Sequence, residues 1–116
     1  MTMFPPFLKR GIDATVEDYI EAIAYVINLV GEDAVGIGTD FTQGYDQTFF
    51  EWITHDKGRH RRLTDFGPVL NPQGIRTIGE FPNLTAAMQH AGWSTSRIAR
   101  ITGSNWLRVF KEVWGD

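Results

Sequence analysis

Asp40 is the residue whose type and position best suit proton-transfer chemistry in this sequence. It directly follows residues 34–39 (AVGIGT), an almost uncharged run typical of a strand buried on both faces. A carboxylate at the carboxyl end of such a strand is held rigidly yet faces the substrate cleft in barrel enzymes, where it can move a proton. A plainer alternative is that Asp40 only caps the turn after the strand.

Metal binding within these residues would have to use histidine or carboxylate, because the sequence contains no cysteine. The same absence excludes disulfides and thiolate nucleophiles. The histidines are His55, His60 and His90. Their spacings match no compact ligand motif, and His90 stands among polar residues of a helical stretch. We therefore expect surface histidines and no metal site made by this chain.

Charge and hydropathy give little support to a nucleic-acid or membrane partner. The 116 residues carry a formal net charge of −3, so attraction to phosphate would have to come from a local patch. Residues 57–62 (KGRHRR) form such a patch, but a solvated face or a contact to an acidic protein surface is the favoured explanation. The apolar start of the chain is far too short to span a bilayer.

A helix over residues 15–30 must precede the strand that carries Asp40. Thr15 and Asp18 fit an N-terminal capping pair, and Gly31 stands where helices often end. Apolar side chains recur at helical spacing between these ends, at Val16, Tyr19, Ile20, Ile23, Val26, Ile27 and Val30. The glycines within residues 34–39 leave little side-chain volume, which predicts that another backbone or a large side chain lies close by.

The rest of the chain indicates short helices and loops. Phe49, Phe50, Trp52 and Ile53 predict a brief helix inside a long loop insertion at about 45–80. Helical patterns follow over residues 84–91, closed by Gly92, and over 94–101. After Gly103, one apolar face is predicted for a last helix; it comprises Trp106, Leu107, Phe110, Val113 and Trp114. The tryptophans could form a stacking platform, but core packing is the default explanation for Trp106 and Trp114.

Strand content is too small for a complete sheet. Besides residues 34–39, only the start of the chain offers a strand, and Pro5 and Pro6 end it after Phe4. Such strands would leave most backbone groups on open edges. A helix followed by a doubly buried strand instead indicates the end of an alternating α/β chain, so the sequence predicts a piece of a larger fold.

Four features, taken in order, carry a family resemblance: the capped helix of residues 15–30, GEDAVGIGTDF (31–41) with Gly44 shortly after, EFPNL (80–84) and GSNWLRVF (103–110). Together they resemble the C-terminal third of the renal (membrane) dipeptidase family. The resemblance implies an α/β fold, with residues 1–116 as a single C-terminal segment of a (β/α)8 TIM-type barrel of the amidohydrolase type. That segment would hold the last one or two strands plus helices. The insertion resembles a bacterial branch of the family.

The resemblance also implies roles for individual residues. Asp40 would end the last barrel strand and transfer protons beside two zinc ions while a dipeptide is hydrolysed. Phe4 and Pro5 match a substrate-lining turn, and Gly44 matches the family glycine after the aspartate. Pro5 stands where animal enzymes have an aromatic residue, and residues 42–43 stand where many relatives have one aspartate, so the dipeptide preference stays open.

The zinc ligands that the resemblance implies belong upstream, and the first of them, a His-x-Asp pair, does not occur here. We therefore expect that the chain alone neither binds the catalytic zinc nor hydrolyses dipeptides, and that its partner is the remainder of the barrel. A homodimer stays open. The alternatives are a non-catalytic interaction module that binds through an exposed sheet edge, and a half-barrel that assembles with a separate chain. A targeting segment would also lie upstream, and the bacterial resemblance favours the cytoplasm.

Overall fold

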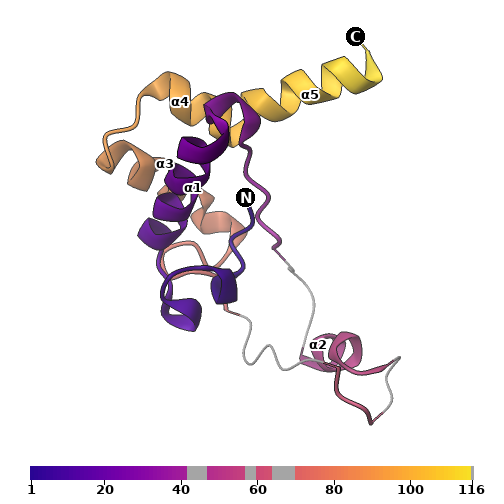
Figure 1. Cartoon of the computed structure of the whole chain (residues 1–116). Coiled ribbons are helices and arrows are strands. Elements are labelled where there is room, and N and C mark those ends of the chain that lie inside the picture. Colours follow the sequence, from indigo (N-terminus) through magenta and orange to yellow (C-terminus); the bar gives the residue numbers. More distant parts are fainter. Residues whose placement is uncertain (42–46, 57–59, 64–69, 116) are drawn as a thin grey trace.

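A computed structural model describes residues 1–41, 47–56, 60–63 and 70–115, and this part of the chain is mostly helical (Figure 1). Its α-helices are α1 (Val16–Val30), α2 (Gln47–Thr54), α3 (Phe81–His90), α4 (Thr95–Ala99) and α5 (Asn105–Trp114). A π-helical turn, η6 (Arg100–Ser104), joins α4 to α5. Short 3-10 turns are η1 (Pro5–Phe7), η2 (Gly11–Asp13), η3 (Glu32–Ala34) and η5 (Ile78–Glu80).

The helix predicted over residues 15–30 is confirmed as α1. Thr15 and Asp18 form the reciprocal capping box, in which the Asp18 carboxylate accepts the Thr15 amide hydrogen at 2.9 Å. Gly31 follows the helix with a φ of 85°, a backbone conformation that glycine adopts at no steric cost. The predicted apolar stripe is mostly buried, although Val30 at its end is 56% exposed.

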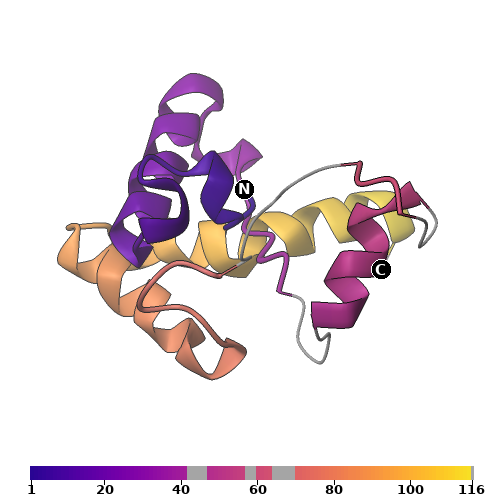
Figure 2. The same cartoon turned by 90° about the horizontal axis from the view of Figure 1, so that it is seen from below.

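The core lies between α1 and the helices of the second half of the chain. Tyr19 and Ile23 of α1, Leu84 and Met88 of α3, and Ile101 of η6 are fully buried. Further buried apolar residues complete this core: Met3, Leu8, Ala14, Val16, Ile20, Ile27, Val35, Ile75 and Ile98. Seen from below, α1 lies beside the α3–α4 pair (Figure 2).

The prediction of a doubly buried strand over residues 34–39 is wrong in two respects. Ala34 belongs to η3, and in the described chain the segment pairs only through an isolated parallel bridge between Thr2 and Gly38. Val35 is buried, but Gly38 is exposed. An extended segment becomes a strand only where neighbours continue the ladder, and here the start of the chain supplies a very short neighbour. The start of the chain is expected to be strand at most up to Phe4 and loop after it; in the described chain it forms only the same isolated bridge at Thr2, and η1 begins at Pro5.

The run α4–η6–α5 leaves the body of the molecule and ends in a projecting helix (Figure 1). The predicted apolar face of α5 is formed, since the ring centroid of Phe110 lies 5.7 Å from that of Trp106 and 4.6 Å from that of Trp114. Core packing is the default prediction for Trp106 and Trp114 on this face, and it is wrong for the described chain. Trp106 is 42% exposed and Trp114 is 75% exposed, because α5 extends beyond the elements that could cover it.

The insertion at about 45–80 contains the predicted brief helix, α2, which Figure 1 shows apart from the other helices. No helix among the described residues is long and apolar enough to cross a membrane.

Candidate functional site

Two extended segments run side by side in parallel and bring Asp40 and Phe4 to the same end. Thr2 and Gly38 form the parallel bridge, and the Gly38 amide donates to the Met1 carbonyl at 2.9 Å. Asp40 stands two residues beyond Gly38, and Phe4 stands two residues beyond Thr2. In a parallel pair both segments run in the same direction, so the residues that follow a bridge lie beyond the same end of the pair. Both side chains therefore belong to the carboxyl-end side of the pair.

Tyr19 of α1 holds the first of these segments, residues 1–4, through its side chain. Its side chain is fully buried, and its hydroxyl donates to the Met1 carbonyl at 2.7 Å. Burial raises the pKa of the Tyr19 phenol above its ordinary value, so the group stays protonated and keeps donating.

Asp40 is exposed and has an unusual backbone. Its φ of 56° makes it the one described non-glycine residue with a positive φ. Aspartate tolerates the left-handed region better than most residues, because its short polar side chain can bond locally. Non-glycine residues in this region often stand at functional sites, where surrounding structure holds them. The side chain is thus presented to solvent from a backbone position that few other residue types would accept.

The segment that leads to Asp40 is held by Trp106 at the start of α5. A Cβ atom built on Gly36 would lie 2.5 Å from the indole Nε1 of Trp106, so only glycine leaves room for this ring. The indole N–H donates to the Ile37 carbonyl at 2.9 Å. The prediction that a large side chain or another backbone lies against these glycines is confirmed at Gly36.

Asn105 and Arg108 hold the turn at the start of the same segment. The buried Asn105 amide donates to the Glu32 carbonyl and to the Val35 carbonyl, both at 2.7 Å. The Arg108 guanidinium donates to the Asp33 carbonyl at 2.8 Å. These contacts, together with those of Trp106, are called the clasp below. The clasp joins the GSNWLRVF motif to the GEDAVGIGTDF motif, which explains physically why the two occur together.

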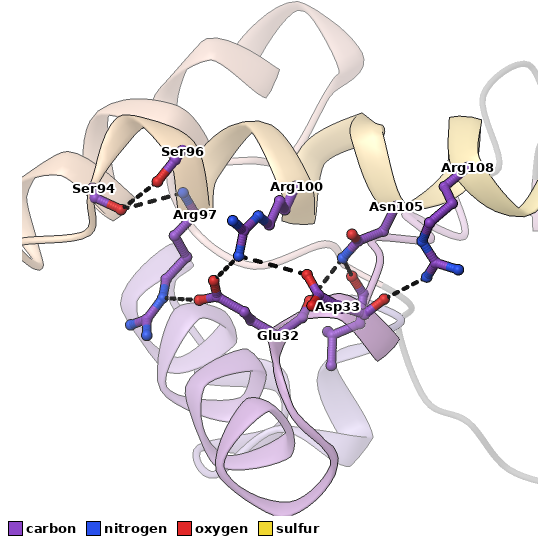
Figure 3. Close-up of polar contacts among 9 residues, drawn as sticks. Glu32, Asp33, Ser94, Ser96, Arg97, Arg100, Asn105 and Arg108 are labelled. Atoms are coloured by element: carbon purple, nitrogen blue, oxygen red, sulfur yellow. Dashed lines mark hydrogen bonds and ion pairs between the residues drawn. The ribbon is translucent and has the colours of Figure 1, made fainter.

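Figure 3 shows an ion-pair cluster beside the clasp, centred on Glu32. Arg97 donates to one Glu32 carboxylate oxygen at 2.8 Å, and Arg100 donates to the other. Arg100 also lies 3.5 Å from the Asp33 carboxylate. Chiefly through its hydrogen bond, Arg97 lowers the pKa of the Glu32 carboxyl below its ordinary value, and the charge of Arg100 adds to the effect.

The predicted substrate-binding residues differ in their surroundings. Phe4 is partly buried, with its ring centroid 5.2 Å from that of Phe7 in an edge-on contact. Pro5 is fully buried within η1. Gly44 lies outside the described residues, as do the neighbouring positions 42–43.

The predicted surface histidines are exposed or partly exposed. His60 and His90 are exposed, and His55 lies at the end of α2 with its ring nitrogen against the Glu51 carbonyl. In the described ranges, no three histidine, aspartate or glutamate side chains come close enough to hold a metal ion. Of the basic patch, the described part contains His60, Arg61 and Arg62, and His60 and Arg61 are exposed.

Sequence reasoning proposed Asp40 as the candidate residue but missed the residues that hold its segment. The sequence contained a signal for Trp106, because the glycines of residues 34–39 predict that a large group lies against them. They do not indicate which residue supplies that group. Asn105 carried a weaker signal, because a single asparagine inside an amphipathic helix is commonly a solvated residue. Only the structure shows that its amide is buried and bonds two carbonyls about seventy positions away in the chain.

Comparison with known proteins shows which protein family this chain belongs to. The model of the membrane dipeptidase family (peptidase family M19) matches residues 1–64 and 63–114. This chain belongs to that family.

Individual relatives agree with this class. Dipeptidase tcpJ of Claviceps purpurea is 30% identical over 97% of this chain, and dipeptidase ataJ of Aspergillus terreus is 31% identical over 81% of it. The crystal structure of an amidohydrolase from Pseudomonas aeruginosa superposes with a TM-score of 0.92 and 61% identity over 99% of this chain. The chain spans 21% and 17% of the two dipeptidases and 35% of the amidohydrolase. It therefore corresponds to a fragment of these longer proteins.

Proposed function

We propose that this chain forms the C-terminal part of a zinc-dependent dipeptidase with a (β/α)8 barrel, and that Asp40 transfers protons during hydrolysis of a dipeptide. The observation that supports this most directly is the parallel bridge between Thr2 and Gly38, which Phe4 and Asp40 follow in the same direction. In barrels of this kind, the residues that act on substrate stand at the carboxyl ends of neighbouring strands. Membership of the dipeptidase family supplies the reaction class.

The chemistry assigned to this chain is limited to Asp40. An exposed carboxylate on a segment anchored by the clasp can take a proton from an attacking water and return it to the departing amine. The described residues offer no ligand set for zinc, so in this proposal the longer protein's other segments hold the two ions. Zinc bound there would activate the water and polarise the peptide carbonyl.

Phe4 is proposed to line the dipeptide site, because it is partly exposed and follows the parallel bridge in the same direction as Asp40. Pro5 would act by supporting that turn, since its ring is fully buried. Gly44 keeps the substrate-lining role that the resemblance implies.

The test places this chain in the Pseudomonas aeruginosa amidohydrolase, in exchange for the region that it matches, and assays a panel of unblocked dipeptides with zinc. We expect hydrolysis by the chimera and none by the 116-residue chain alone. Asp40→Asn should lower kcat by about 10²- to 10⁴-fold, the usual contribution of general acid–base catalysis. Asp13→Asn, which changes an exposed carboxylate in η2, is the matched control and should leave kcat unchanged.

Two results would contradict the proposal. One is full kcat in the Asp40→Asn chimera, which would remove Asp40 from the chemistry. The other is hydrolysis by the isolated chain, which would mean that it needs no further segments. If neither the chimera nor the unmodified amidohydrolase cleaves any dipeptide of the panel, the assigned reaction class is wrong.

A further inference from the structure

Residues 35–38 have two backbone edges, and the start of the chain occupies one of them. In an extended segment, the N–H and C=O groups of successive residues point alternately to opposite sides. The Met1 amino group donates to the Gly36 carbonyl at 2.6 Å, and the Gly38 amide donates to the Met1 carbonyl at 2.9 Å. Gly36 and Gly38 therefore face the first segment, and Val35 and Ile37 face the other way.

The second edge is occupied by one helical run instead of a strand. The Ile37 amide donates to the Ile101 carbonyl at 3.2 Å, and the Ile37 carbonyl accepts the Trp106 indole N–H at 2.9 Å. The Val35 carbonyl accepts the Asn105 side-chain amide at 2.7 Å. A backbone acceptor and two side-chain donors from residues 101–106 thus pair with the Ile37 amide and with the Val35 and Ile37 carbonyls, three groups that a neighbouring strand would otherwise use.

The π-helical turn η6 leaves the Ile101 carbonyl free to accept a hydrogen bond from Ile37. In an α-helix the Ile101 carbonyl would accept the amide hydrogen of Asn105, four residues later. In η6 the Asn105 amide donates instead to the Arg100 carbonyl, five residues earlier. The Ile101 carbonyl then accepts from Ile37. Gly36, which has no Cβ, lets the indole approach closely enough to complete the edge.

We propose that the junction of η6 and α5 is an edge cap, which takes the place of a neighbouring strand along residues 35–37 and prevents this edge from pairing with a second copy of the chain. Uncovered strand edges are templates for association between chains, and covering them with a helix is an established protection. Because the Ile37 amide and the Val35 and Ile37 carbonyls are already hydrogen-bonded, these groups are not open to a strand of another chain.

The test uses the 116-residue chain and does not depend on dipeptidase activity. Amide exchange at Ile37 is measured in the native chain, and self-association is followed by sedimentation together with the infrared signal of intermolecular β-sheet. The native chain should protect the Ile37 amide. Asn105→Leu combined with Trp106→Phe should speed exchange at Ile37 on the order of tenfold or more and produce the intermolecular β-sheet signal. Trp114→Phe, the same change further along α5, should do neither.

Folding is monitored in the same samples through amide exchange at Ile23, which lies on the buried face of α1. If the double variant loses protection at Ile23, the single Trp106→Phe variant replaces it in the test. The edge cap is overturned if Ile37 in the native chain exchanges as fast as exposed loop amides. It is equally overturned if a folded variant lacking the indole or amide donors keeps native exchange at Ile37 and gains no β-sheet association.

Discussion

At the scale of single residues, the described acids Asp18 and Glu32 hold structure, whereas Asp40 faces solvent. Asp18 accepts hydrogen bonds from the Thr15 amide and from Arg10, the latter at 2.7 Å. Burial works against the charge of Asp18, yet these donors together lower its pKa below the ordinary value. Glu32 is held in the same way by Arg97 and Arg100. Asp40 differs in being exposed and in following the clasped segment, which suits an acid that acts on a substrate.

The lowered pKa of Glu32 predicts how stability changes with pH. A carboxyl whose folded-state pKa is depressed stabilises the fold above its unfolded pKa, near 4.5, and loses that contribution as the pH falls through the folded value. Glu32→Gln removes this linkage. Its melting temperature should therefore lie below that of the native chain at pH 7, and the difference should shrink steadily below about pH 4.5.

The control for this prediction is Glu21→Gln, which removes an exposed ion pair with Lys9. Exposed pairs contribute little, so its melting temperature should track that of the native chain at every pH. A Glu32→Gln difference that stays constant from pH 7 to pH 3 would show that the ion-pair cluster does not contribute through charge.

At the scale of elements, periodicity and capping predicted α1, α2, α3 and α4 because their signals are local. Thr15, Asp18 and Gly31 mark the ends of α1 within the sequence itself. The π-helical turn and the edge it covers could not be predicted, because they depend on contacts between residues about seventy positions apart. The predicted strand failed for the same reason, since a strand is defined by neighbours that a local pattern does not contain.

The close contact between Gly36 and Trp106 gives an element-scale prediction. Gly36→Ala would place a Cβ 2.5 Å from the indole Nε1, so the ring must move and the hydrogen bond to Ile37 must weaken. Overpacking of this kind typically costs about 1–3 kcal/mol in the free energy of unfolding, which urea denaturation can measure.

The matched control is Gly103→Ala in η6, where an added Cβ would meet no atom within 4 Å. Alanine favours helical backbone over glycine by up to about 1 kcal/mol, so this variant should be as stable as the native chain or slightly more stable. Equal stability of the Gly36→Ala variant and the native chain would mean that the ring does not sit where the structure places it.

At the scale of the whole molecule, the chain has one well-formed core and several apolar surfaces that its own described residues leave exposed. Leu84 is fully buried, whereas Leu107 and Tyr25 are 62% and 65% exposed. The sequence predicted correctly that the chain is a piece of a larger fold, because too few strands were present. It could not predict which apolar residues would stay uncovered, since the pattern on α5 is the same whether or not something lies against it.

Leucine-to-alanine substitutions should have different effects on the free energy of unfolding in the core and on the exposed face of α5. Leu84→Ala in α3 should lower the free energy of unfolding by about 2–5 kcal/mol, because it leaves a cavity in the core. Leu107→Ala in α5 should change it by no more than about 0.5 kcal/mol, since that side chain is mostly exposed. Urea denaturation of both variants compares them directly, and a large loss in the Leu107→Ala variant would show that α5 is covered in solution.

The clasp also determines when, during synthesis, the candidate site can take shape. Its bonds from Asn105, Trp106 and Arg108 reach back 69 to 75 positions to residues 32–37. A ribosome shields the residues that it has made last, so the stretch ending in Asp40 emerges long before its anchors do. Nascent chains stalled before residue 105 must therefore display this stretch without the clasp, held only by its contacts to the start of the chain, and Asp40 reaches its final position only after translation has moved well past the clasp.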